Sequence, residues 1–317
     1  MTQHITLAAG IDTGKRALDI ALSTGGAGLK VDNDPAGHDR LADWLARAGV
    51  VRVGIEASGG YERAVVDHLR GAGFELVRLQ PAQVRAYAGF RLQRAKNDRI
   101  DAALIAQCAA AATEIRPAPD PRLDDLAEDL TRLEQLDEDI ARAKTRLEAF
   151  RAASTRAAVQ ADIKRLNAER RAQRRRLADM IAAHPDLAQR LALIESVPGI
   201  GQRTAIAILI RLPEIEDLSR EQAAALAGLA PFDRDSGARH GNRAIAGGRA
   251  RLRRALYAAS LPAAYQWNPA LVSLYRRLRD AGKPHKLALI AVARKLLIFA
   301  ITVVQRGTPW TSKKQAI

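Results

Sequence analysis

Apolar residues recur at every third or fourth position through the middle of this 317-residue chain. The series is Leu126, Leu130, Leu133, Leu136, Ile140, Ala143, Leu147 and Phe150. This is the spacing of a coiled-coil seam of about four heptads, and it predicts a long helix with one apolar face. The seam therefore divides the chain into a part before it, a helical middle and a part after it.

A second helical segment follows the first, after a predicted break at residues 152–155, and continues to about Pro185. Residues 123–148 contain nine acidic and four basic side chains, whereas residues 156–176 contain two acidic and eight basic ones. Antiparallel arms of opposite charge attract each other, so we predict a hairpin with a structural or dimerising role. The alternative is that the basic arm lies on nucleic acid through Arg170, Arg171, Arg174, Arg175 and Arg176.

The chain before the hairpin has the pattern of an α/β domain. Short apolar runs predict strands, and residues at helical spacing between them predict helices. Three strands followed by alternating helices and strands favour a mixed sheet of the ribonuclease H kind. We expect this domain over residues 1–116, a proline-containing linker and coiled-coil hairpin over 117–190, and a mostly helical domain over 191–317.

Four acids of the first domain occupy positions from which they can meet. Asp12 and Glu56 each end a predicted strand, and ligands gather at the carboxyl ends of strands in such sheets. Asp98 and Asp101 are three residues apart at a predicted helix start, so both point from one face. Oxygen ligands suit Mg²⁺, and two ions would clamp the attacking and leaving oxygens of a phosphodiester. The alternative for Asp98 and Asp101 is an acidic helix start stabilised by the helix dipole.

The charge balance indicates a polyanionic partner. Lys and Arg number 50 against 35 Asp and Glu, a net charge of +15, and nucleic acid is the first candidate. The single cysteine, Cys108, excludes a disulfide framework or a Cys-rich zinc site and fits a reducing cytoplasm. No signal peptide is expected at the N-terminus, and Arg294 and Lys295 interrupt the most apolar run, 287–304, which we interpret as a buried helix. These features predict a cytoplasmic protein without a membrane partner.

A glycine-containing turn opens the last third of the chain. The sequence Val-Pro-Gly-Ile-Gly at 197–201 precedes an apolar helix, as in a helix-hairpin-helix motif. Its glycines would let the backbone approach a phosphate at the start of the next helix. We therefore expect Gly199 and Gly201 to contact duplex DNA without regard to sequence, the alternative being an ordinary turn between two helices.

A basic loop and helix follow over residues 230–257. Between residues 234 and 295 there are fourteen basic and two acidic side chains, and clustered arginines suit bidentate contacts with phosphates. The expected phosphate-binding residues are Arg234, Arg239, Arg243, Arg249, Arg251, Arg253 and Arg254. Ser236 lies in this loop, but a serine is a nucleophile only when a base or metal activates it and cations neutralise its target. From the residues alone, a turn is the simpler interpretation of Ser236.

Three motifs in the first domain resemble one known family. Residues 10–15, 54–61 and 96–102 are similar to the RuvC-like half of the DEDD transposases, which bacterial insertion sequences encode and which include bridge-RNA-guided recombinases. Residues 230–257 resemble the transposase domain of the same family. The resemblance implies that Asp12, Glu56, Asp98 and Asp101 bind the metal and that Ser236 is the nucleophile.

The resemblance implies a DNA recombinase that transposes an insertion sequence. Ser236 would attack a scissile phosphate, two Mg²⁺ ions would assist, and strand exchange would follow. It also implies guidance by a bridge RNA, assembly into a dimer or tetramer, and action at the nucleoid of a bacterial cytoplasm. One rival is a RuvC-like junction resolvase, in which the acids activate water and Ser236 is incidental. The other is a nucleic-acid binder without enzymatic activity.

Overall fold

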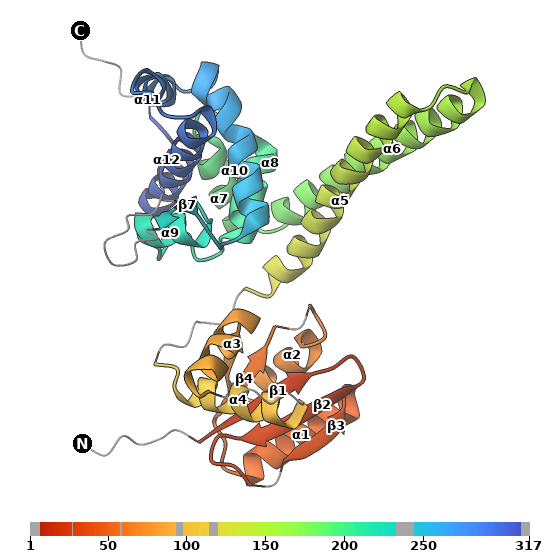
Figure 1. The fold of residues 1–317 in the computed structure, drawn as a ribbon, viewed down its shortest axis with the longest axis vertical. Helices are drawn as coiled ribbons and strands as arrows, with labels where there is room; N and C mark the ends of the chain where they lie inside the picture. Colours follow the sequence, from red (N-terminus) through yellow and green to blue (C-terminus); the bar gives the residue numbers. More distant parts are fainter. Residues whose placement is uncertain are drawn as a thin grey trace. The chain divides into compact units, whose positions relative to one another are not determined.

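The computed structural model describes residues 7–26, 28–57, 59–92, 98–113, 120–232 and 244–311, and of Asp98 and Arg99 only the backbone. Contacts within the chain divide it into two compact units, Met1–Ala118 and Pro119–Ile317 (Figure 1). Unit 1 is the α/β part, and unit 2 is almost entirely helical. The hairpin, which the sequence sets apart as a segment of its own, lies within unit 2.

Unit 1 is built on the mixed sheet that its sequence predicts. The strands are β1 (Ala8–Thr13), β2 (Ala17–Leu22), β3 (Leu29–Asp32), β4 (Arg52–Glu56) and β5 (Glu75–Leu79), in the order β3-β2-β1-β4-β5. The first three strands are antiparallel neighbours, whereas β4 runs parallel to β1 and β5 runs parallel to β4. The carboxyl ends of the three parallel strands therefore lie at the same edge of the sheet.

Helices cover both faces of this sheet. Those in the described residues are α1 (Pro35–Arg47), α2 (Arg63–Gly71), α3 (Pro81–Phe90) and α4 (Asp98–Ala110). On one face, Ile11 and Ile55 belong to the apolar core that includes residues of α1 and α2. On the other, Ala8 and Val77 belong to a separate core with residues of α3 and α4. Because side chains alternate along a strand, β1 contributes Ala9 and Ile11 to the first core and Ala8 to the second.

Two glycines let α4 lie directly on the centre of the sheet. A Cβ atom at Gly10 would lie 2.2 Å from the backbone oxygen of Ala102, and one at Gly54 would lie 2.6 Å from the Cβ of Ala109. Any larger residue at either position would push the helix away from the strands. The glycines of the two motifs therefore serve the packing that brings α4 to β1 and β4.

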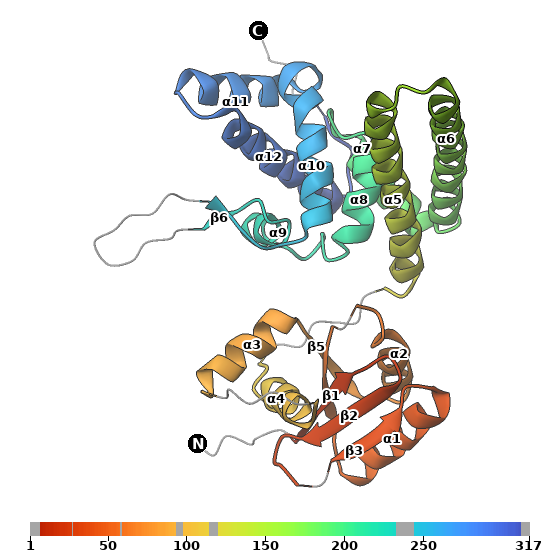
Figure 2. The ribbon, with the colours of Figure 1, turned by 45° about the vertical axis from the view of Figure 1, so that its right-hand side comes forward.

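Unit 2 begins with the predicted hairpin. Its arms are α5 (Arg122–Ala149) and α6 (Ala153–Ala182), which lie side by side in Figures 1 and 2 and are joined by three residues. The helices that follow are α7 (Pro185–Glu195), α8 (Gln202–Arg211), α9 (Arg220–Leu226), α10 (Ala250–Pro262), the π-helix η1 (Ala263–Trp267), α11 (Pro269–Asp280) and α12 (His285–Arg306). A short ribbon pairs β6 (Pro231–Phe232) with β7 (Ala244–Ile245).

The apolar helix α12 forms the centre of unit 2. By length and composition it could cross a membrane, but 56% of its most apolar window is buried inside the unit, as the interrupted apolar run predicts. Figure 2 shows α10, α11 and α12 together, and α12 contacts both of the other two helices. The same core includes Leu123, Leu126 and Leu130 of α5 and Leu177 of α6, so the base of the hairpin is fixed to the C-terminal helices.

Candidate carboxylate site and nucleic-acid interface

Asp12 and Glu56 lie on neighbouring parallel strands at the same level of the sheet. Gly10 is paired with Gly54 and Ile11 with Ile55, so the next step in the register brings Asp12 beside Glu56. Each acid lies two residues after a glycine that faces α4, and residues two apart in a strand share a face. Neighbouring strands are about 4.8 Å apart. The sheet therefore sets two carboxyl groups side by side, toward α4.

The direction of α4 brings its first turn to these strand ends. Arg52, at the amino end of β4, donates to the carbonyl oxygens of Ala109 (3.4 Å) and Ala112 (3.0 Å), near the end of α4. Ala102, near its start, lies over Gly10. The helix thus runs opposite to β4, and Asp101 lies in the turn nearest the carboxyl ends. Asp98 begins the helix, and its side chain lies outside what the structure describes.

The donor chemistry of this site fits a hard divalent cation. Asp12, Glu56 and Asp101 offer only carboxylate oxygens, which Mg²⁺ prefers, and adjacent carboxylates repel unless a cation lies between them. Among the described side chains, no group of three or more His, Cys, Asp or Glu is close enough to hold a metal ion. The expected fourth acid, Asp98, is the one whose side chain is not described.

A fifth acid, which the sequence analysis did not single out, lies in the same row. Asp19 of β2 is the register partner of Asp12 and also of Lys30 on β3. Lys30 Nζ lies 2.9 Å from the Asp19 carboxylate, so this acid has a cationic partner. The signal in the sequence is an acid in the middle of an otherwise apolar strand. Its ion pair with Lys30 ties β2 to β3 beside the two acids at the strand ends.

A buried polar pair ties together the segments that follow β1 and β4. His38 is only 4% exposed, and its Nε2 lies 2.8 Å from Oδ1 of Asn33. The Asn33 amide donates to the carbonyl oxygens of Gly14 (3.0 Å) and Tyr61 (3.1 Å). Burial, and then the neighbouring His68, lower the pKa of His38. His38 is therefore satisfied inside the protein, and its partner Asn33 supports the loops beside Asp12 and Glu56.

The predicted nucleic-acid interface is described only in part. Ser236, Arg234, Arg239 and Arg243 lie outside the described residues, so their prediction stays a prediction. Arg249, Arg251, Arg253 and Arg254 are described, at the start of α10.

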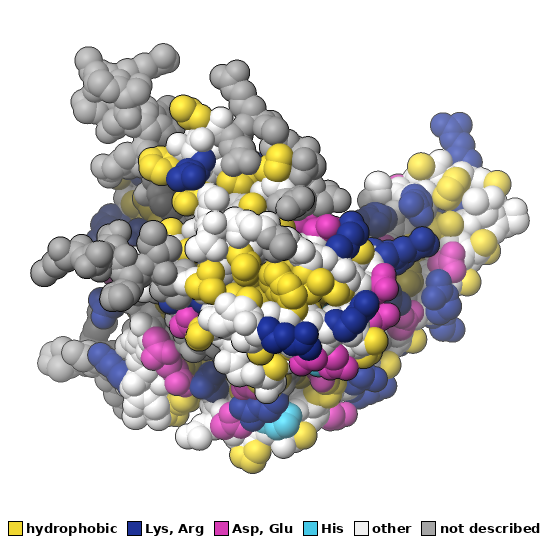
Figure 3. Space-filling view, turned by 90° about the horizontal axis from the view of Figure 1, so that it is seen from below, with side chains coloured by type: hydrophobic (Ala, Val, Ile, Leu, Met, Phe, Trp, Pro, Cys, Tyr) yellow, Lys and Arg dark blue, Asp and Glu magenta, His cyan; other side chains and the backbone are white. Residues whose placement is uncertain are grey.

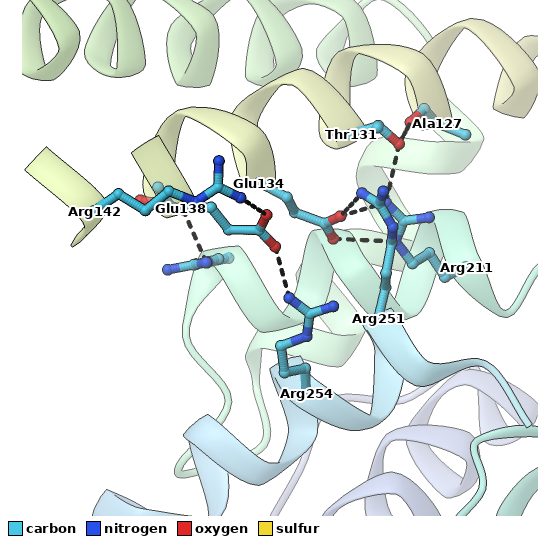
Figure 4. A network of polar contacts seen from close by, with 10 residues as sticks. Ala127, Thr131, Glu134, Glu138, Arg142, Arg211, Arg251 and Arg254 are labelled. Carbon is cyan, nitrogen blue, oxygen red and sulfur yellow. Dashed lines mark hydrogen bonds and ion pairs between the residues drawn. The ribbon is translucent and has the colours of Figure 1, made fainter. Parts of the chain in front are cut away.

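Two of these arginines contact the acidic arm of the hairpin (Figure 4). Arg251 Nη1 lies 2.6 Å from the Glu134 carboxylate, and Arg254 Nη1 lies 2.7 Å from that of Glu138. Arg211 of α8 reaches the same Glu134 at 2.8 Å. Burial lowers the pKa of Arg211, whereas Glu134 raises it. Acids of α5 thus bind arginines of α8 and α10, and these ion pairs orient the hairpin relative to the other helices of unit 2.

The other two arginines also have partners within unit 2. Arg249 donates to both carboxylate oxygens of Glu214, at 2.6 and 2.8 Å. Arg253 donates to the carbonyl oxygen of Gly247 at 2.6 Å. A phosphate contact by any of these arginines would therefore have to share or replace a contact inside the protein.

The two glycines of the predicted helix-hairpin-helix differ in their surroundings. Gly199 has a φ of 99°, and a Cβ atom there would lie 2.6 Å from the Cβ of Ala263 in η1. Asn268 donates to the neighbouring Pro198 carbonyl oxygen at 3.0 Å. Gly201, by contrast, has open space beside its Cα and is the N-cap residue of α8. Gly199 therefore serves the packing of the turn against η1, and the contact of the two glycines with DNA stays a prediction.

The excess positive charge belongs to unit 2. Residues 1–118 contain 15 Lys and Arg against 13 Asp and Glu, whereas the remaining residues contain 35 against 22. On the face seen in Figure 3, dark-blue and magenta side chains are mixed around a hydrophobic strip. On α6, Arg171, Arg174 and Arg175 are exposed and form no ion pair with any described residue. A polyanion would therefore be attracted mainly by residues 119–317.

Two family models match the chain. Residues 9–152 match a DEDD domain of IS110 described as a transposase, and residues 191–276 match a domain described as a transposase of the IS116/IS110/IS902 family. The first match includes the four predicted metal-binding acids, Asp12, Glu56, Asp98 and Asp101. The second includes the glycine turn, the serine loop and the start of α10.

Full-length relatives accompany these matches. The chain is 25% identical to the pilin gene-inverting protein of Moraxella lacunata over 316 residues, which are 96% of this chain and 97% of that protein. It is 26% identical to the pilin gene-inverting protein of Moraxella bovis over 317 residues, with the same two coverages. An uncharacterized 43.6 kDa protein of insertion element IS110 from Streptomyces coelicolor is 31% identical over 150 residues, which are 47% of this chain and 36% of that protein.

Proposed function

The chain belongs to the IS110 family of transposases, and from this premise we propose that it recombines DNA through Ser236 and the carboxylates of unit 1. The observation that carries the proposal is the placement of Asp12 beside Glu56 at in-register strand ends, under the first turn of α4. In this proposal unit 1 is a ribonuclease H-like, RuvC-like domain, and its site also includes Asp98 and Asp101.

Ser236 would carry the covalent step. Its Oγ attacks the scissile phosphorus, an ester bond to serine forms, the bond to the 3′-oxygen breaks, and the serine proton is transferred to that leaving oxygen. The freed 3′-hydroxyl of one strand then attacks the phosphoserine of a partner strand, which regenerates the serine and leaves the number of phosphodiester bonds unchanged. Arginines around the loop would neutralise the phosphate during the attack.

The acids would hold the divalent ions, Mg²⁺ in our proposal. When bound, such ions lower the pKa of the attacking hydroxyl and offset charge on the leaving oxygen. Asp12 and Glu56 would hold an ion between neighbouring strands, while Asp98 and Asp101 would approach from α4. The repulsion among these acids would then be relieved by the ions.

The arrangement of the machinery favours an assembly of several chains. The acids belong to unit 1 and Ser236 to the range of unit 2, so one chain can supply acids to the serine of another. The Moraxella relatives are named for inverting a gene, and inversion requires that DNA be broken and rejoined at both ends of a segment. Guidance by a bridge RNA and action at the bacterial nucleoid complete the proposal and rest on the resemblance.

A denaturing gel tests the proposed chemistry. Full-length protein would be incubated with Mg²⁺, labelled DNA carrying the joined ends of the element, and RNA transcribed from its flanking non-coding sequence. We expect a labelled adduct that migrates with the protein and is absent from Ser236→Ala and Asp12→Asn. Asp43→Asn, which changes an exposed acid of α1, serves as the matched control and should retain the adduct.

The same gel separates the rival functions. Free cleaved DNA from the wild type and from Ser236→Ala alike would mean that water is the nucleophile, as in a junction resolvase. Binding without any cleavage, unaffected by Asp12→Asn, would mean that the chain only binds nucleic acid.

A further inference from the structure

The π-helix η1 and the helix α11 enclose a shallow pocket on the surface of unit 2. Its volume is about 660 Å³, and its walls include Tyr265 and Gln266 of η1 and Arg276, Arg277 and Asp280 of α11. Two aromatic rings of η1 are exposed, Tyr265 by 57% and Trp267 by 60%. None of these residues belongs to the acid site or to the predicted arginine contacts. The pocket is therefore a separate feature of the molecule.

The aromatic segment is held rigidly. The Tyr265 hydroxyl lies 3.0 Å from that of Tyr275, which in turn lies 2.7 Å from Nδ1 of His285. Trp267 is followed by Asn268, which is 2% exposed, accepts from the amide of Leu271 at the start of α11 and donates to the Pro198 carbonyl. The ring of Tyr265 and the backbone that carries Trp267 are thus fixed before binding, so less conformational freedom is lost when a flat ligand stacks on this segment.

The charge beside the rings is of the kind that binds phosphates. Arg276 and Arg277 are exposed and have no ion-pair partner in the part of the chain that the structure describes. They differ in this respect from Arg251 and Arg254 of α10, which acids of α5 hold. Gln266 and Asp280 add hydrogen-bonding groups to the walls. The pocket thus combines the exposed ring of Tyr265 with available guanidinium groups and polar groups, and the exposed ring of Trp267 follows two residues along η1.

We propose that the surface formed by Tyr265, Trp267, Arg276 and Arg277 binds unpaired nucleotides. An aromatic ring stacks on the face of a base that is not covered by its neighbours, while arginines contact the adjacent phosphates. In a continuous duplex the base faces are covered, so the rings would have nothing to stack on. The occupant is a single-stranded segment of RNA or DNA, which deepens the proposed function and rests on it.

Fluorescence anisotropy with the full-length protein tests this surface. The probes are labelled single-stranded RNA, single-stranded DNA and duplex DNA of one sequence, each of about twelve nucleotides or base pairs. We expect Tyr265→Ala and Trp267→Ala each to weaken single-strand binding at least about five-fold, the lower end of the known contribution of stacking. Trp267→Phe keeps a ring and should retain most of the affinity. Duplex binding should not change.

Two controls accompany these variants. Phe90→Ala removes an exposed ring from unit 1 and should leave binding unchanged. Arg276→Gln and Arg277→Gln should each reduce the salt dependence of binding by about one counterion. Tryptophan fluorescence adds a direct readout, because a stacked base should quench Trp267 in the wild type and this quenching should disappear in Trp267→Phe.

Each result bears on the proposal. Unchanged single-strand affinity in both alanine variants, or an equal loss of duplex affinity, would overturn it. If the rings strengthen binding of single-stranded RNA more than of single-stranded DNA, RNA is the occupant. If they strengthen both equally, the surface also binds a single strand of DNA. If Asp12→Asn abolishes the DNA adduct while Trp267→Ala binds normally, the pocket is rejected and the recombinase stands. The opposite pattern keeps the pocket and rejects the recombinase.

Discussion

The acid row of unit 1 (Asp12 and Glu56) and the arginine face of unit 2 (Arg251 and Arg254) are both clusters of like charge, but different contacts bring their members together. Asp12 and Glu56 come together through the register of two strands. Arg251 and Arg254 are held by acids of α5 that lie 117 and 116 residues earlier in the chain. The first cluster follows from local strand patterns, whereas the second depends on how a long helix docks.

This difference teaches how a charged motif should be interpreted. A run of arginines predicts a phosphate-binding surface only if no acid from elsewhere in the chain reaches it. The hairpin supplies such acids to Arg251 and Arg254 of α10, whereas Arg276 and Arg277 of α11 and Arg171, Arg174 and Arg175 of α6 are exposed and have no acidic partner among the described residues. Among the described arginines, these five are therefore more available to a polyanion than Arg251 and Arg254.

The contact of α4 with the sheet is the most sensitive point of unit 1. Gly10→Ala would place a Cβ atom 2.2 Å from the backbone of Ala102 and Ala106, and backbone cannot rotate away as a side chain can. We expect a loss of about 3 kcal/mol or more in the free energy of unfolding, together with loss of the DNA adduct. Chemical denaturation measures the first effect and the denaturing gel the second.

Gly71→Ala is the matched control for this substitution. No heavy atom lies within 4 Å of the added Cβ, and the residue ends α2. We expect a change of less than about 1 kcal/mol in the free energy of unfolding. Equal stability of the two variants would show that α4 does not rest on Gly10, and the argument that brings Asp101 to the strand ends would fail.

In unit 2, the contact that we expect to be most sensitive to substitution is the one between α5 of the hairpin and the helices α8 and α10. Glu134→Gln removes the carboxylate between Arg211 and Arg251, and the Arg211 side chain is only 15% exposed. Leaving a guanidinium partly buried and unpaired should cost about 2–3 kcal/mol in the free energy of unfolding. Glu138→Gln, whose partner Arg254 is exposed, should cost less than about 1 kcal/mol. Chemical denaturation of the two variants measures both values.

The same pair of variants sharpens the interpretation of the arginine face. If Arg251 can contact DNA, its release from Glu134 should strengthen duplex binding and steepen the salt dependence by about one counterion. Unchanged binding in Glu134→Gln would mean that Arg251 serves only to fix the hairpin.

The parts of the molecule that the sequence predicts are those that depend on neighbours in the chain. The mixed sheet follows from strand patterns and the helical hairpin from its apolar seam, and the break between α5 and α6 lies at 150–152, close to the predicted 152–155. The convergence of Asp12 and Glu56 follows because parallel strands end at one edge. The buried helix α12 follows from its interrupted apolar run.

The parts that could not be predicted depend on contacts distant in sequence. Nothing near Gly199 in the sequence indicates that Ala263 lies against it, so its role in packing cannot be predicted from the motif. No local pattern indicates that Trp267 stays exposed, because a π-helix has no recognisable sequence period. Asp19 was not singled out because its partner Lys30 lies on another strand. In each case the physical cause is a tertiary neighbour.

The smallest expected difference between the two regions is in how their stability depends on pH. The pKa of His38 is lowered from its ordinary value of 6.5, because burial disfavours the charged ring. The unfolded chain therefore binds more protons than the folded one below pH 6.5, so the stability that neutral His38 contributes is present above this pH and is lost as the pH falls. Asn33 binds His38 and also donates to the carbonyl oxygens of Gly14 and Tyr61. The loss of stability should therefore extend to the loops beside the acid row.

Hydrogen exchange followed by mass spectrometry can locate this effect. Between about pH 7 and pH 5, after correction for the intrinsic exchange rate, protection should fall in peptides covering α1 and the end of β1 but not in those covering α10. His38→Gln should remove the difference, whereas the matched variant His184→Gln, at the start of α7, should retain it. Suppose instead that protection falls equally in both units and that His38→Gln does not change this. Low pH would then destabilise the whole fold, and the contact between Asn33 and His38 would not specifically support the acid row.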